Sequence, residues 1–95
     1  MGDDVLRIAL LASGSGSNLE AVIRGCHEGL VAARPVVALA NKPGALALER
    51  ARKLDVPTLV ADHRDFGSRE AHEERIIELL EPHDPQLLVL AGYMR

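Results

Sequence analysis

Four short apolar runs, separated by segments with helical periodicity, constrain the fold of this chain more than any other feature. The runs cover residues 5–12, 35–40, 57–60 and 87–91, and the third is the weakest. A run that is apolar on both of its alternating faces is typical of a parallel strand buried between two layers. None approaches the roughly 20 apolar residues that cross a bilayer. We therefore predict four strands of one parallel sheet.

Three helices are predicted between these strands, over residues 17–29, 45–54 and 68–81. In the first, apolar residues recur at i, i+3, i+4 and i+7, namely Leu19, Val22, Ile23 and Cys26, and Gly29 stands where a helix often ends. Strand alternating with helix indicates right-handed βαβ units. The sequence thus predicts a Rossmann-like α/β fold, an open parallel sheet of order 3-2-1-4 with helices on both faces.

The loop between the first strand and the first helix is a candidate binding site. Residues 12–18 read ASGSGSN. Backbone N–H groups at a strand-to-helix turn of this kind bind phosphate, and glycines permit the tight turn and the close approach of the ligand. Serine and asparagine side chains add further donors. We predict an anion site formed by Ser15, Gly16, Ser17 and Asn18.

The loop sequence also has other interpretations. Ser17 and Glu20 have the spacing of a capping box, which would explain the serine without any ligand, and this alternative stays open. A dinucleotide site is disfavoured, because Leu19 replaces the third glycine and Asn41 stands where an acid would bind the ribose. We therefore expect neither a nicotinamide nor a flavin cofactor.

Composition narrows the classes of partner. Eleven Lys and Arg against 14 Asp and Glu leave no basic footprint for nucleic acid. Cys26 is the single cysteine, so an internal disulfide is excluded, and its place on the apolar stripe indicates a core residue. The four histidines lack metal-like spacing and are predicted at the surface. We expect a cytoplasmic protein with no metal, nucleic acid or membrane partner.

Four segments together resemble the glycinamide ribonucleotide formyltransferases. Residues 13–19 (SGSGSNL) are similar to the phosphate loop of that family, and residues 41–42 (NK) with 48–51 (LERA) to its second βα unit. Residues 66–70 (FGSRE) and 88–95 (LVLAGYMR) are similar to its later segments. The resemblance implies formyl transfer from formyl-tetrahydrofolate to the amine of glycinamide ribonucleotide, a step of de novo purine biosynthesis.

The resemblance also implies roles for single residues. Arg69, Met94 and Arg95 would bind the folate; the alternatives are that Met94 only packs and that Arg69 is a solvated arginine at a helix start. The family's catalytic asparagine, histidine and aspartate follow its fourth strand. We therefore expect the chain to hold no catalytic residue and to be inactive alone.

Two other functions remain open: a non-catalytic phosphate-binding module, and a fragment that works only with a complementary C-terminal chain. We expect residues 1–95 to form one unit, truncated after the fourth strand. Residues 87–91 would then be an apolar edge strand, and such an edge can pair with another copy of the chain.

Overall fold

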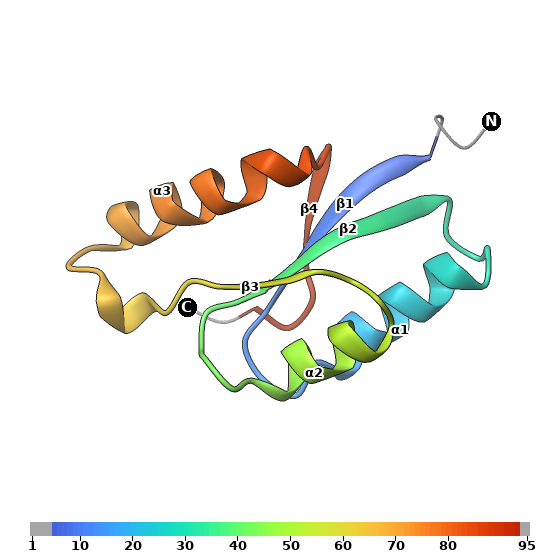
Figure 1. Ribbon diagram of the computed structural model, residues 1–95, viewed down its shortest axis with the longest axis horizontal. Coiled ribbons are helices and arrows are strands. Elements are labelled where there is room, and N and C mark those ends of the chain that lie inside the picture. Colours follow the sequence, from blue (N-terminus) through green and yellow to red (C-terminus); the bar gives the residue numbers. More distant parts are fainter. Residues whose placement is uncertain (1–4, 94–95) are drawn as a thin grey trace.

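The computed structural model describes residues 5–93, which form a sheet covered by helices (Figure 1). The strands are β1 (Leu6–Ala12), β2 (Ala33–Ala40), β3 (Thr58–Val60) and β4 (Leu87–Leu90). The helices are α1 (Ser17–His27), α2 (Leu46–Lys53) and α3 (Arg69–Leu80), with 3-10 turns η2 (His63–Asp65) and η3 (Glu81–His83). The predicted elements are all present, with ends that differ by one or two residues.

The strand order is β3-β2-β1-β4, and every pair is parallel. The predicted order is therefore confirmed. Strand β1 lies between β2 and β4, so that Leu10 pairs with Ala38 on one side and with Val89 on the other. The α/β class and the Rossmann-like arrangement follow from this order.

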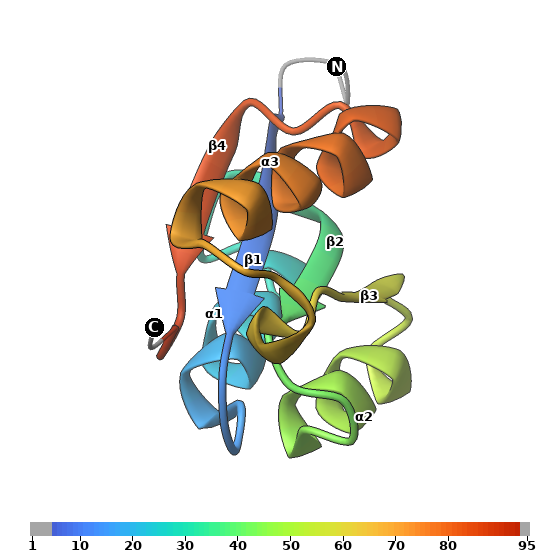
Figure 2. The ribbon, with the colours of Figure 1, turned by 90° about the vertical axis from the view of Figure 1, so that its left-hand side faces the viewer.

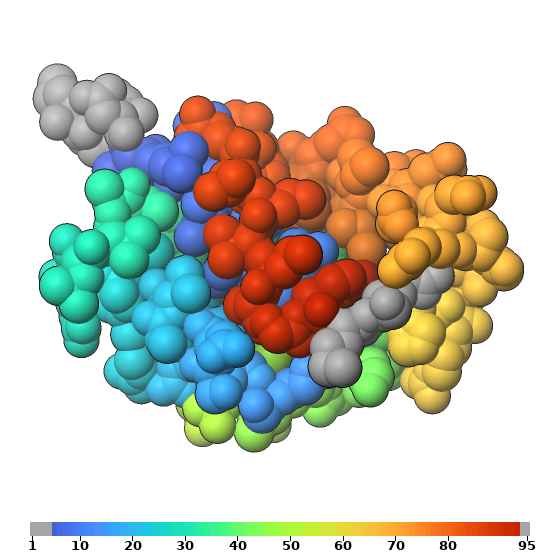
Figure 3. Space-filling view, turned by 180° about the vertical axis from the view of Figure 1, so that it is seen from behind, coloured from blue at the N-terminus to red at the C-terminus, as the bar shows by residue number. Residues whose placement is uncertain are grey.

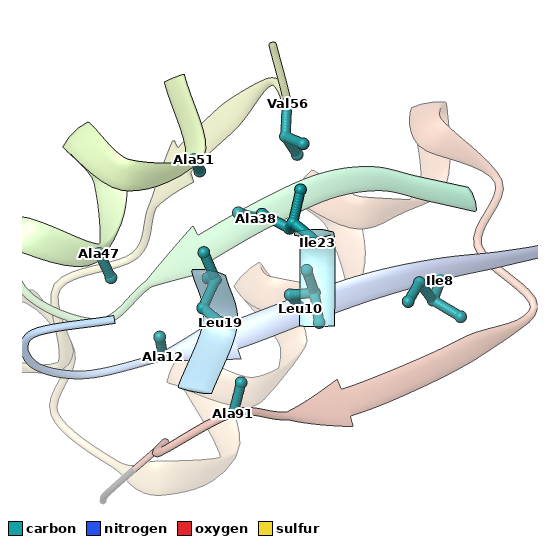
Figure 4. Packing of buried hydrophobic residues seen from close by; sticks show 10 residues of the cluster. All are labelled: Ile8, Leu10, Ala12, Leu19, Ile23, Ala38, Ala47, Ala51, Val56 and Ala91. Carbon is teal, nitrogen blue, oxygen red and sulfur yellow. The ribbon is translucent and has the colours of Figure 1, made fainter. Parts of the chain in front are cut away.

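Helices cover both faces of the sheet, as predicted, with α1 and α2 on one face and α3 on the other (Figure 2). Alternate residues of β1 point to opposite faces: Ile8, Leu10 and Ala12 pack with α1 and α2, while Ala9 and Leu11 pack with α3. Figure 4 shows Leu19 and Ile23 of α1 packed against the strands. Because both faces of β1 are buried from Ile8 to Ala12, every residue in that part of the strand is apolar.

The start of α1 differs from one alternative that the sequence left open. The residue before the helix is Gly16, with φ of 81°, and no side chain caps the first turn. Ser17 is already helical, so the capping-box interpretation is wrong. The carboxylate of Glu20 binds Arg24 and Arg50 and does not reach back to the turn. At the other end, Gly29 has the left-handed φ of 80° that ends a helix.

One histidine contradicts the expectation that all four lie at the surface. His72 is fully buried on the inner face of α3, one turn before Ile76. Its Nε2 lies 2.6 Å from the carbonyl oxygen of Ala61, and its ring centroid is 5.3 Å from that of Phe66. A hydrogen bond to the backbone and an aromatic neighbour allow this polar side chain to stay in the core.

Strand β4 is at the edge of the sheet and lies open on the face shown in Figure 3, as the red segment between α1 and α3. Its leucines are substantially exposed: 49% for Leu87, 47% for Leu88 and 65% for Leu90. An exposed apolar edge is a template for pairing with another chain. Whether copies of this chain pair there stays a prediction.

Candidate functional site

The loop between β1 and α1 forms one wall of a pocket of about 340 Å³ at the carboxyl edge of the sheet. The structure brings all four predicted anion-binding residues to this pocket, and Ser13, Gly14, Lys42, Ala91 and Gly92 complete its lining. Ser15, Ser17 and Asn18 are exposed there, whereas Gly16 is buried. The pocket thus joins residues that lie up to 79 positions apart in the chain.

The segment after β4 forms the opposite wall. The backbone N–H of Ser13 donates to the carbonyl of Gly92 at 3.2 Å, and that of Ala91 to the carbonyl of Leu11 at 2.8 Å. A Cβ atom placed on Gly92 would lie 3.8 Å from the Asn18 side-chain amide. Strand β1 leaves through α1 on one face, while β4 arrives from α3 on the other, which is the switch point where open α/β sheets bind ligands.

Helix α2 braces the loop from a third side. The N–H of Ala47 donates to the carbonyl of Gly14 at 3.2 Å, and Nε of Arg50 donates to the carbonyl of Ser15 at 2.8 Å. A Cβ atom at Gly16 would lie only 2.4 Å from Cα of Ala47. Glycine is therefore required at position 16 by its backbone angle and by its neighbour.

Two features of the pocket favour an anion. Its floor is the N-terminus of the 11-residue helix α1, whose unpaired N–H groups favour an anion. Lys42, exposed on the pocket rim, adds a cation. Glu20, the acid of the first turn, is engaged by Arg24 and then by Arg50, and these hydrogen bonds hold its pKa below the usual value.

Lys42 was not among the predicted site residues. A signal for it existed, because a cation directly after a buried strand must stand at the carboxyl edge, where the loop also lies. Arg50 was missed as well. No local pattern reveals it, since Arg50 is 35 positions from Ser15 in the sequence. The two residues come together only because α2 packs against α1.

Arg69, predicted to bind the folate, lies at a second groove on the opposite face of the sheet. This groove, of about 260 Å³, is mostly apolar and is lined by Leu11, Arg69, Glu73, Ile76, Ile77, Leu88 and Tyr93. The Arg69 side chain is 67% exposed, and its Nε is 3.6 Å from the Glu73 carboxylate. Met94 and Arg95, the other two predicted folate residues, lie outside the described residues.

The groove and the pocket adjoin. Gly92 lines the pocket and Tyr93, the next residue, lines the groove. The two sites are therefore lined by consecutive residues just after β4.

The described residues, 5–93, offer little support for metal, membrane or thiol chemistry. No three His, Cys, Asp or Glu side chains in this range are placed to share a metal ion. Within the same range, no helix is both long and apolar enough to cross a membrane. Cys26 is half-buried against the core, and burial raises the pKa of its thiol. This thiol is poorly suited to act as a nucleophile.

Comparison with known proteins identifies the family. A profile described as formyl transferase matches residues 6–95. The chain belongs to this formyl transferase family. It is 41% identical over 91 residues to the trifunctional purine biosynthetic protein adenosine-3 of Drosophila melanogaster, covering 94% of this chain and 7% of that protein. It is 37% identical over 90 residues to the phosphoribosylglycinamide formyltransferase of Escherichia coli (strain K12), covering 95% and 42%.

Solved structures of the family have the same fold. Glycinamide ribonucleotide transformylase 1 of Symbiobacterium toebii superposes with a TM-score of 0.91 at 41% identity, over 96% of this chain and 43% of that one. The corresponding protein of Geobacillus kaustophilus gives a TM-score of 0.90 at 36% identity, over 96% and 48%. The chain spans less than half of the length of these relatives.

Proposed function

We propose that this chain is the N-terminal part of a glycinamide ribonucleotide formyltransferase and binds the phosphate of that substrate. The observation that carries the proposal is the pocket at the switch point, in which the N-terminus of α1, the serines of the loop and Lys42 converge. The names of two relatives, a phosphoribosylglycinamide formyltransferase and a glycinamide ribonucleotide transformylase, support this choice of substrate.

The chemistry of the pocket fits a phosphate monoester. Backbone N–H groups of the loop and of the first turn of α1 would bind its oxygens, supported by Ser15, Ser17 and the Asn18 amide. Lys42 would neutralise part of its charge from the rim. The buried Gly16 lets the backbone approach the ligand, because no side chain intervenes.

The co-substrate, formyl-tetrahydrofolate, would lie in the adjoining groove. Its apolar walls suit a ring system, and Arg69 stands beside them to pair with a carboxylate. The expected contacts of Met94 and Arg95 remain part of this proposal. The shared segment at Gly92 and Tyr93 would then bring the formyl group near the substrate amine.

In the reaction the amine attacks the formyl carbon, the bond from that carbon to the folate nitrogen breaks, and the amine proton passes to the leaving nitrogen. This requires an oxyanion-stabilising donor and a proton carrier. The residues that line the pocket include no histidine, aspartate or glutamate. We therefore propose that the chain alone binds its ligands without transferring the formyl group, a task left to the family's asparagine, histidine and aspartate.

Calorimetric titration with glycinamide ribonucleotide tests the proposal. We expect binding by the chain, weakened in Lys42→Gln and unchanged in Lys53→Gln, which removes the same charge from the end of α2. An assay of folate absorbance should show no turnover. Absence of binding, or equal losses in the two lysine variants, would contradict the site. Binding of the nucleotide but not of the folate would instead favour a non-catalytic phosphate-binding module.

A further inference from the structure

Helix α2 holds two consecutive carbonyl groups of the phosphate loop. The Gly14 carbonyl accepts the N–H of Ala47, and the Ser15 carbonyl accepts Nε of Arg50. Both carbonyl groups therefore point toward α2. No residue of α2 lines the pocket, so the ligand would approach the loop from elsewhere.

Because the peptide bond is planar, the direction of a carbonyl group also fixes the direction of the next N–H group. In a trans peptide the C=O of one residue and the N–H of the next point in opposite directions. If the carbonyl groups of Gly14 and Ser15 face α2, the N–H groups of Ser15 and Gly16 face away from it. These are the two donors in the middle of the loop.

The guanidinium that holds the Ser15 carbonyl is itself fixed. Its Nη1 forms an ion pair with Glu20 of α1, and the other oxygen of that carboxylate accepts Nε of Arg24 at 2.7 Å. Arg50 thus binds the loop through Nε and α1 through Nη1 of the same guanidinium. A guanidinium can bind two acceptors in fixed directions because its N–H donors are held in a rigid plane. The ammonium group of lysine carries its donors on one nitrogen and lacks this geometry.

We propose that Arg50 is a positioning residue of the phosphate loop: it holds the Ser15 carbonyl so that the N–H of Gly16 faces the phosphate, and it does not touch the phosphate itself. This rests on the proposed function of the loop. The alternative is that Arg50 contributes only its positive charge, and the two roles respond differently to lysine.

The test is a titration of the ¹⁵N-labelled chain with inorganic phosphate, followed by the amide resonance of Gly16. In the wild type we expect this resonance to shift as phosphate binds. Arg50→Lys keeps the positive charge but removes the planar set of guanidinium donors. Removing one charge-assisted hydrogen bond should weaken phosphate binding about tenfold and reduce the Gly16 shift. Arg52→Lys, on the same helix and outside the pocket, should change neither.

A second variant guards against a general loss of folding. Glu20→Gln removes the charge that anchors Arg50, leaves the loop sequence intact, and should weaken binding by a smaller factor. Combined with Arg50→Lys it should add little, because both changes act on one network. If the wild type does not respond to phosphate, the loop function and the role of Arg50 both fail. If the wild type responds and Arg50→Lys binds equally well, only the role of Arg50 is refuted.

Discussion

Replacing Gly16 by alanine tests the geometry of the phosphate loop most directly. The structure gives two separate costs. A left-handed φ of 81° costs a residue with a Cβ about 1–2 kcal/mol. The new Cβ would also lie 2.4 Å from Cα of Ala47, and relieving overlap of this kind costs about 1–3 kcal/mol. Alanine also reduces the conformational entropy of the unfolded chain, which offsets about 0.4–1 kcal/mol of this loss in stability. We expect a net loss of about 3 kcal/mol in the free energy of unfolding.

Two other glycines provide matched controls. Gly29 has a φ of 80°, and a new Cβ there would meet nothing within 4 Å. Gly29→Ala is therefore destabilised by the backbone angle alone, and its free energy of unfolding should fall by about 1 kcal/mol. Gly14 lies in the same loop as Gly16, has no left-handed angle, and has nothing within 4 Å of a new Cβ. Gly14→Ala should therefore change stability by less than about 1 kcal/mol.

Urea unfolding of the four proteins, followed by circular dichroism, measures these differences. The order of stability should be Gly14→Ala, then Gly29→Ala, then Gly16→Ala. Binding of glycinamide ribonucleotide should be lost in Gly16→Ala at urea-free conditions where it remains folded, because the loop must move away from α2. Equal losses in Gly16→Ala and Gly29→Ala would refute the close contact with Ala47.

Two further predictions concern other parts of the molecule. Light scattering across a dilution series should show self-association through β4 that Leu88→Lys abolishes. Leu30→Lys, at an exposed leucine between α1 and β2, should not abolish it, and a monomer at every concentration would contradict the prediction. The side-chain and backbone hydrogen bonds from Arg64 lower the pKa of Asp62 to about 2, so its stabilising contribution is complete above the ordinary value of 3.8 and is lost as pH falls toward 2. The thermal midpoint should fall over that interval less steeply in Asp62→Asn, and parallel curves would refute the assignment.

The sequence alone determined the elements and the position of the loop, and it limited the order of the strands in the sheet. Periodicity is a local property: β1 is apolar at every position from Ile8 to Ala12 because both of its faces are covered there, and that can be recognised without coordinates. The handedness of βαβ units then limits the order of the strands. For the same reason the sequence assigns the four residues of the loop to one site, and all four line one pocket.

Only the tertiary structure decided what holds and completes that site. Ser17 and Glu20 fit a capping box by spacing, yet Glu20 binds Arg50, which is 30 residues away, and Gly16 occupies the capping position. His72 shows the same limit, since its burial depends on Ala61 and the approach of α3 to the sheet. Such contacts are chosen by packing between elements, where hydrogen bonds and burial outweigh local preference. Local sequence patterns therefore do not predict these contacts.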